Sequence, residues 1–132
     1  MESIGRPRVA LASVWLMGLV TAVVIVQGAL FGAFYSEGEK GFIGAHGIEG
    51  DLTGYISIVV LIPLAFAARF PKELRIGWWT VLWVVVWNVQ AHVFGYGIED
   101  VRWFEIIHIP LALFILAFGL YLVTLGQRAR RS

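Results

Sequence analysis

Apolar residues fall into four long runs, separated by short polar segments. None of the runs contains Asp, Glu, Lys or Arg, and they cover Val9–Tyr35, Leu52–Ala68, Ile76–Ile98 and Ile106–Gly126. A helix that crosses a bilayer needs about 20 apolar residues, each adding about 1.5 Å of length. The pattern therefore predicts four transmembrane helices, over about residues 9–35, 46–68, 76–98 and 104–126. The second helix is expected to begin before its apolar run, near His46.

The segments between these runs are short. We expect a Gly- and Glu-rich loop over 36–45, a second loop over 69–75 in which Pro71 ends the preceding helix, and a third over 99–105. Short connections force consecutive helices to run antiparallel. The sequence therefore predicts an all-α fold, a single domain over 1–132, in which four transmembrane helices form an up-down-up-down bundle.

Composition supports the membrane assignment. Hydrophobic residues make up 59% of the chain and charged residues only 14%, whereas a soluble domain has about 25% charged residues. The first run is too long for the apolar region of a signal peptide and lacks an A-x-A site, so we expect it to be retained. The chain has no Cys, which excludes disulfides and thiolate metal sites, and its net charge of +1 favours no nucleic-acid partner.

The distribution of charge predicts the orientation in the membrane. Eight of the ten Lys and Arg residues belong to one side of the expected bundle: Arg6, Arg8, Arg69, Lys72, Arg75, Arg128, Arg130 and Arg131. Basic residues near helix ends remain in the cytoplasm. We therefore expect a multi-pass protein of the inner (plasma) membrane with both termini in the cytoplasm, and the lipid bilayer as its surroundings.

A shift of 63 residues aligns the first expected helix with the third. Seven positions are identical under this shift: Trp15/Trp78, Leu19/Leu82, Val23/Val86, Val26/Val89, Gln27/Gln90, Phe31/Phe94 and Gly32/Gly95. With one residue of slack, His46 also aligns with His108. Matching Val and Leu is common among apolar helices, but matching Gln, Trp and His is not. The pattern favours an internal two-fold repeat of a helix pair, related by an axis along the membrane normal.

His46 and His108 are the candidate metal ligands. Each is expected to open a helix at the outer side, and those two helices are parallel and diagonal in the bundle. Neighbouring helices pack about 8–10 Å apart, so diagonal axes are about 12–14 Å apart, which suits two imidazoles that hold a porphyrin iron. Ionisable groups at membrane depth are costly and usually functional. Plain interfacial or packing histidines are the competing interpretation.

Small and polar residues follow each histidine along its helix face at a spacing of about 100° per residue. The residues expected to shape a pocket for a b-type haem are Gly50 and Thr53 on one helix and Ala112 and Gly119 on the other. Gln27 and Gln90 are buried polar groups expected to bridge helices or reach the ring edge. The same glycine spacing is also typical of close helix packing.

This layout resembles one half of a heme A synthase. The resemblance is carried by Gln27 and Gly32, Gln90 and Gly95, and the histidines His46 and His108, with Glu105 three residues before His108. It covers nearly the whole chain and extends to small uncharacterised bacterial four-helix membrane proteins with the same two histidines. The resemblance implies a four-helix unit in which a histidine pair on the second and fourth helices holds a haem.

The sequence thus favours haem binding near the outer leaflet, for electron transfer or haem handling, and assigns no catalytic residue. Two alternatives remain open. One is an accessory subunit without a cofactor, which would pack against a larger membrane complex through the Trp-rich face of the third helix, or form a homodimer. The other is a carrier or sensor of a quinone or another apolar ligand. The stripe of Trp79, Trp83 and Trp87 is expected to serve packing. His92 is expected to hydrogen-bond Asn88, four residues away, or to serve the haem.

Overall fold

The computed structural model describes the backbone of residues 6–37, 40–95 and 102–131, and the side chains of residues 6–30, 47–93 and 106–131. These residues form four helical rods. In chain order they are α1 (Pro7–Glu37); α2 (Lys40–Ile56), which continues through the π-helical turn η1 (Ser57–Leu61) into α3 (Ile62–Ala67); α4 (Ile76–Val89), which continues into the π-helical turn η3 (Gln90–Gly95); and α5 (Arg102–Arg131). A short 3-10 helix, η2 (Lys72–Leu74), lies between α3 and α4.

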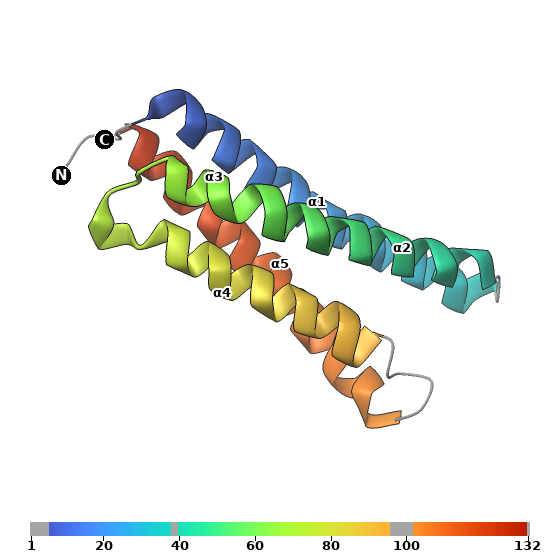
Figure 1. The fold of residues 1–132 in the computed structure, drawn as a ribbon. Helices are drawn as coiled ribbons and strands as arrows, with labels where there is room; N and C mark the ends of the chain where they lie inside the picture. The colour runs from blue at the N-terminus through green and yellow to red at the C-terminus, as the bar shows by residue number, and fades with distance from the viewer. Residues whose placement is uncertain (1–5, 38–39, 96–101, 132) are drawn as a thin grey trace.

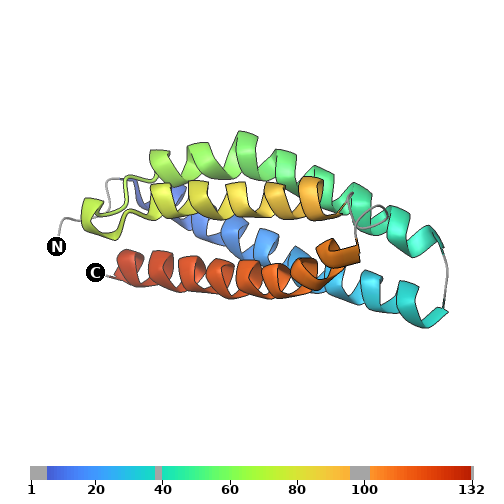
Figure 2. The same cartoon turned by 90° about the horizontal axis from the view of Figure 1, so that it is seen from below.

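The four rods run lengthwise through the molecule, and at the end away from the chain ends α1 and α2 diverge from α4 and α5 (Figures 1 and 2). The α1 helix contacts α2, α3 and α5, and α4 contacts α3 and α5. Among the described residues, α1 and the α4 rod therefore each contact both the α2–α3 rod and α5. The α2–α3 rod and α5 are consequently diagonal in the bundle. Both chain ends lie at the end of the molecule where α3 connects to α4 (Figure 1).

The first connection differs from the expected one. A loop was expected over 36–45, but α1 extends to Glu37 and α2 begins at Lys40. His46 therefore does not open the second helix; it is the seventh residue of α2. Glycines at 41, 44, 47 and 50 lower the helix propensity of this segment, which is why the sequence favoured a loop. Packing of α2 against α1 outweighs that preference.

Two prolines lie within helical rods. Pro63 follows η1 directly, at the start of α3. Proline has no N–H, and its ring crowds the carbonyl four residues earlier. For Pro63 that carbonyl belongs to Val59, which lies within the wider π turn over Ser57–Leu61. Pro110 lies inside α5, two residues after His108. The first turns of α5 bend away from the line of the rest of that helix (Figure 2).

Trp83 forms the centre of the packed interior. Its side chain is fully buried, and its indole Nε1–H donates to the carbonyl oxygen of Ile115 at 2.8 Å, which joins α4 to α5. Its ring meets that of Trp87 edge to face, with centroids 6.2 Å apart. The assignment of this stripe to packing is thus correct for Trp83 and Trp87. Both rings lie inside the chain, whereas Trp78 and Trp79 of the same helix are exposed.

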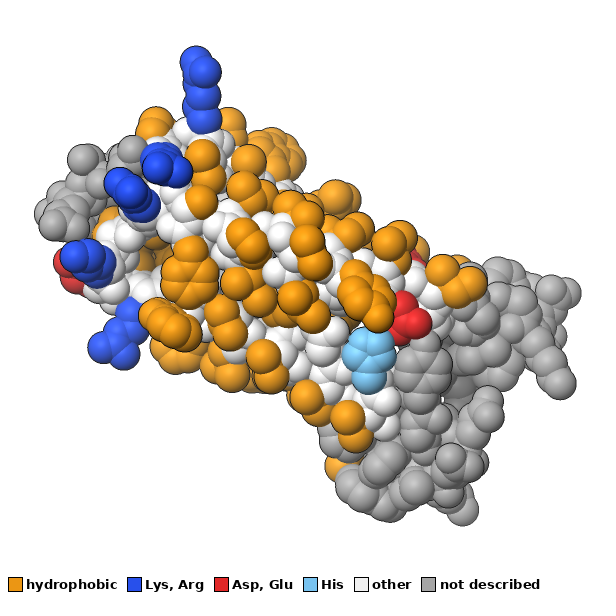
Figure 3. Space-filling view, in the orientation of Figure 1, with side chains coloured by type: hydrophobic (Ala, Val, Ile, Leu, Met, Phe, Trp, Pro, Cys, Tyr) orange, Lys and Arg blue, Asp and Glu red, His pale blue; other side chains and the backbone are white. Residues whose placement is uncertain are grey.

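Three helices are long and apolar enough to cross a membrane, over Pro7–Leu30, Gly47–Ala67 and Ile106–Arg131. The remaining rod, α4 with η3, joins a 14-residue α-helix to a π-helical turn. Large apolar side chains such as Trp15, Leu113 and Trp78 point outward and are more than half exposed. Lys and Arg gather at one end of the visible face, beyond an apolar middle (Figure 3). This fold is compatible with a small integral membrane protein.

Candidate functional site

Polar side chains are concentrated in the half of the bundle core that lies away from the chain ends. The buried ones are Thr53, Ser57, Gln90 and His108. Elsewhere in the core, Thr21 and Thr80 donate their hydroxyls to carbonyls of their own helices, at Met17 and Ile76. Hydroxyls satisfied in this way are ordinary in membrane helices. Ser13 is also buried outside this half. Gln90 and His108 are the buried residues with an amide or an imidazole in the described core, and they therefore call for a functional explanation.

Gln90 connects the third rod to α5 beside the candidate ligand. Its Nε2–H donates to the backbone carbonyl oxygen of His108 at 2.9 Å, in a buried position. His108 is the seventh residue of α5 and its side chain is only 8% exposed. Gln90 occupies the first position of η3, and π-helical turns occur often at functional sites. The expectation that Gln90 bridges helices is thus correct, and its bridge is to the helix turn that carries His108.

Gln27 plays the matching part on α1. A Cβ built on Gly50 would lie 3.0 Å from the Gln27 Nε2 atom and 4.0 Å from the Ala91 Cβ. The absence of a side chain at Gly50 therefore lets α1, α2 and η3 meet at one level. Gly50 is one turn along α2 from His46, or about 6 Å at the rise of an α-helix. Each glutamine thus reaches the rod that follows its own, within about a turn of that rod's histidine.

At Gly54, one turn further along α2 from Gly50, the contact between α2 and α4 is equally close. A Cβ on Gly54 would lie 2.9 Å from the Asn88 Oδ1 atom. The Asn88 amide donates to the Val84 carbonyl on its own helix at 2.8 Å. Asn88 is therefore held against α2, and the amide that was expected to serve His92 donates to the backbone.

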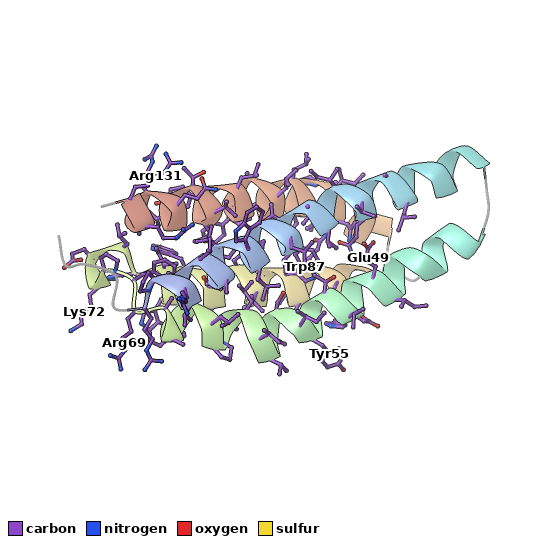
Figure 4. The ribbon with its side chains drawn as sticks, turned by 90° about the horizontal axis from the view of Figure 1, so that it is seen from above. Glu49, Tyr55, Arg69, Lys72, Trp87 and Arg131 are labelled. Carbon is purple, nitrogen blue, oxygen red and sulfur yellow. The ribbon has the colours of Figure 1, made fainter. Side chains whose placement is uncertain are left out.

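Acidic residues of α2 lie at the same level. Asp51 Oδ1 is 3.5 Å from His92 Nδ1, and both side chains are about two-fifths exposed. This pair lies at the surface between α2 and η3, where the visible face shows a histidine beside an acidic side chain (Figure 3). Glu49 is half-buried and points between the rods (Figure 4). Its Oε2 atom is buried and has no hydrogen-bond partner among the described side chains.

Among the described side chains, Oε1 of Gln90 is also buried and open. The buried hydroxyls of Ser57, about two turns deeper than Glu49, and of Ser13 on α1 are open too. Buried polar atoms normally have a partner, and leaving one without costs about 1–3 kcal/mol. The Glu49 carboxylate and the Gln90 carbonyl can both accept an N–H hydrogen bond. An imidazole that ligates a metal has such an N–H to donate.

The remaining expected site residues fall into three groups. Thr53 is buried and Ala112 half-buried, at the level of the polar core. The backbone of His46 lies in α2, while its imidazole, like the side chain of Glu105, is outside the described residues. Gly119 lies against the packed core, where an added Cβ would be 2.7 Å from the Trp83 ring.

No protein-family model, curated protein or solved structure matches the chain. The site must therefore be interpreted from its own geometry. Among the described residues, no three His, Asp or Glu side chains come together as a metal site. A single histidine, His108, lies buried in the polar half, and the diagonal rod carries the second.

The sequence did not predict the pair that Asp51 forms with His92. Glu49, three residues from His46, points into the bundle on the same helix. The spacing of Glu49 from Thr53 and of Thr53 from Ser57, four residues each, places all three on one helix face. That face was visible in the sequence. The pairing with His92 was not, since it depends on the register between α2 and η3.

Proposed function

We propose that the chain is a four-span integral membrane protein whose rods run up, down, up and down, with both termini in the cytoplasm. Three rods have the length and hydropathy for this role, and the fourth, α4 with η3, lies against α3 and α5 and has no charged residue apart from His92. Eight of the ten Lys and Arg residues of the whole chain lie next to the chain ends or in the α3–α4 connection. The basic-residue rule then makes that end cytoplasmic.

A reporter enzyme fused after Ser132 tests the orientation. The fusion should be active only as a cytoplasmic reporter, because the last turns of α5 carry Arg128, Arg130 and Arg131. A second fusion within the α1–α2 connection, after Glu39, serves as the opposite control and should be active only as a periplasmic reporter. Periplasmic activity after Ser132 would contradict the proposed topology.

We also propose that the two helix pairs are repeats of one unit. His46 and His108 are both the seventh residue of their helices, and Gln27 and Gln90 each lie against the following rod close to its histidine. Repeats of this kind place related sites symmetrically about an axis along the membrane normal. The two histidines would then occupy equivalent positions.

On this basis we propose that His46 and His108 hold a b-type haem at the outer end of the bundle, as the histidine pair of a heme A synthase half does. The observation that carries the proposal is the burial of His108 in a polar core, diagonal to the rod that bears His46. The donor set fits the group: neutral imidazole is a common haem ligand, and open buried acceptors on Glu49 and Gln90 can receive imidazole N–H groups. The tight glycine contacts at Gly50 and Gly54 limit the site to the outer turns.

A haem with two histidine ligands supplies one-electron transfer. The chain's own residues position the ligands. Gln90 fixes the turn of α5 that carries His108 through its 2.9 Å hydrogen bond. The closely packed glycines at Gly50 and Gly54 hold α2 against its neighbours, and the apolar core below excludes water. The polar outer half would thus orient the ligands, and the apolar half would keep the bundle rigid.

An absorption spectrum of the full chain purified in mild detergent tests this function. We expect a Soret band that shifts and sharpens on reduction with dithionite, at about one haem per chain after haem is supplied during expression. Absence of the band under these conditions would contradict haem binding. Retention of an extractable quinone in place of haem would favour the apolar-ligand alternative, and stoichiometric co-purification with a larger complex would favour the accessory subunit.

A further inference from the structure

A second site lies at the opposite end of the molecule, where α3 passes through η2 into α4. The structure has a cavity of about 720 Å³ there, formed by the end of α3, the connection and the first turns of α4. Its lining falls into a basic set, Arg69, Lys72 and Arg75, and an apolar set that includes Phe66, Trp78 and Trp79. The polar core with its histidines contributes nothing to this cavity.

The three basic side chains that line this cavity are exposed. Arg69 and Lys72 project from the same end of the bundle (Figure 4). Among the described residues none of the three cations forms an ion pair, and the neighbouring Glu73 does not line the cavity. The cavity therefore holds three positive charges without an internal counter-charge. Charge complementarity favours an anionic occupant.

The backbone at two of these positions is unusual. Arg69 and Arg75 both adopt the left-handed conformation, with φ of 52° and 49°. Glycine or asparagine takes this conformation at lower cost than arginine. The conformation turns the chain sharply on both sides of η2 and thereby brings the two arginines to one cavity.

The apolar part of the cavity continues onto the surface of the bundle that would face lipid. Phe66 and Trp78 meet edge to face with centroids 5.4 Å apart, and both are exposed. Leu82 lies one turn further along α4, in the direction of the membrane interior, and is also exposed. Tryptophan and basic residues at this depth are typical of the membrane–water interface. An occupant with an anionic head and an apolar tail matches both halves.

We propose that this cavity binds the phosphate head group of an anionic phospholipid, with the acyl chains lying along Phe66, Trp78 and Leu82. The three cations hold the phosphate, and the aromatic rings cover the glycerol and the upper acyl carbons. Basic pockets between helices at the cytoplasmic side bind lipid head groups in this way. The proposal requires that the chain lies in a membrane but is independent of haem binding.

Lipid titration of the purified full chain in mild detergent tests the site. Phosphatidylglycerol is added and bound lipid is counted by native mass spectrometry, with phosphatidylcholine as the neutral lipid. We expect one tightly bound phosphatidylglycerol and at least about tenfold weaker binding of phosphatidylcholine, since each basic side chain near the lipid surface contributes roughly fivefold. Inorganic phosphate and glycerol phosphate should not displace the lipid at equal concentration, because they lack the tail.

The decisive variant is Arg69→Asn/Lys72→Gln/Arg75→Asn. Asparagine tolerates the left-handed backbone, so the turn is preserved while three charges are removed. We expect about 100-fold weaker phosphatidylglycerol binding, at roughly fivefold for each charge. The matched control, Arg128→Gln/Arg130→Gln/Arg131→Gln, removes three charges from the last turns of α5, on the other side of the same end (Figure 4). Its binding should be nearly unchanged.

Three results would overturn the proposal. Equal loss in the α5 control would mean that general surface charge attracts the lipid. Equal binding of phosphatidylcholine would remove the role of the cations. Displacement by glycerol phosphate at equal concentration would identify a site for soluble phosphate in place of a lipid.

Discussion

Replacement of His108 by alanine is expected to abolish haem binding. The side chain of His108 is buried in the polar half of the core, and its carbonyl is held by Gln90. Removal of groups that support a metal ligand lowers affinity about 10–100-fold. Removal of the ligand itself should lower the affinity for haem by more than that. The Soret absorbance per chain should therefore fall to the level of unspecific haem. His46→Ala should give the same result if the two histidines form the ligand pair.

His92→Ala is the matched control for this experiment. His92 lies on η3 at a similar level but pairs with Asp51 and is 43% exposed. This variant should retain most of the haem. Imidazole added to the His108→Ala protein should restore part of the Soret band, because it can enter the vacated position. This recovery distinguishes a lost ligand from a lost fold. Loss of haem in His92→Ala together with its retention in His108→Ala would contradict the assignment.

Three of the four rods could be predicted closely from the sequence because each contains a long run without acidic or basic residues. The start of α2 could not. Its glycine-rich first turns have low helix propensity in isolation, and they are helical because α1 lies alongside. Propensity describes an isolated segment, whereas the contact of Gly50 with Gln27 depends on a second helix. The π-helical turns were not predicted either, although Pro63 marks the place of one of them.

The candidate site was also only partly predictable, because some of its features depend on contacts between helices that are distant in the sequence. Gln90 was correctly expected to be buried and to bridge helices, because an amide within a membrane helix needs an internal partner. Gly119 was expected to shape a pocket, and in the structure it lies close to Trp83 and Thr21. A glycine on an inward face permits either a pocket or a close helix contact, and only the position of Trp83 decides between them. The Asp51–His92 pair depends on inter-helix register, which a hydrophobic pattern does not specify.

Gly119→Ala is expected to destabilise the bundle strongly for so small a change. The added Cβ would lie 2.7 Å from the Trp83 ring and 3.0 Å from the Thr21 Cγ2 atom, and would also meet the Thr21 hydroxyl. Trp83 cannot move away freely, because it is fully buried and its indole donates to Ile115. Overpacking of this kind costs about 1–3 kcal/mol.

Gly28→Ala provides the comparison for this prediction, since a Cβ on Gly28 has no neighbour within 4 Å. Alanine in a helix interior is favoured over glycine by about 1 kcal/mol, so this variant should be neutral or slightly more stable. Thermal unfolding in detergent, followed by circular dichroism, measures both. We expect the midpoint of Gly119→Ala to fall by several degrees while that of Gly28→Ala does not fall. Equal midpoints would show that α1, α4 and α5 are not packed around Gly119, and the central contact of the bundle would have to be placed elsewhere.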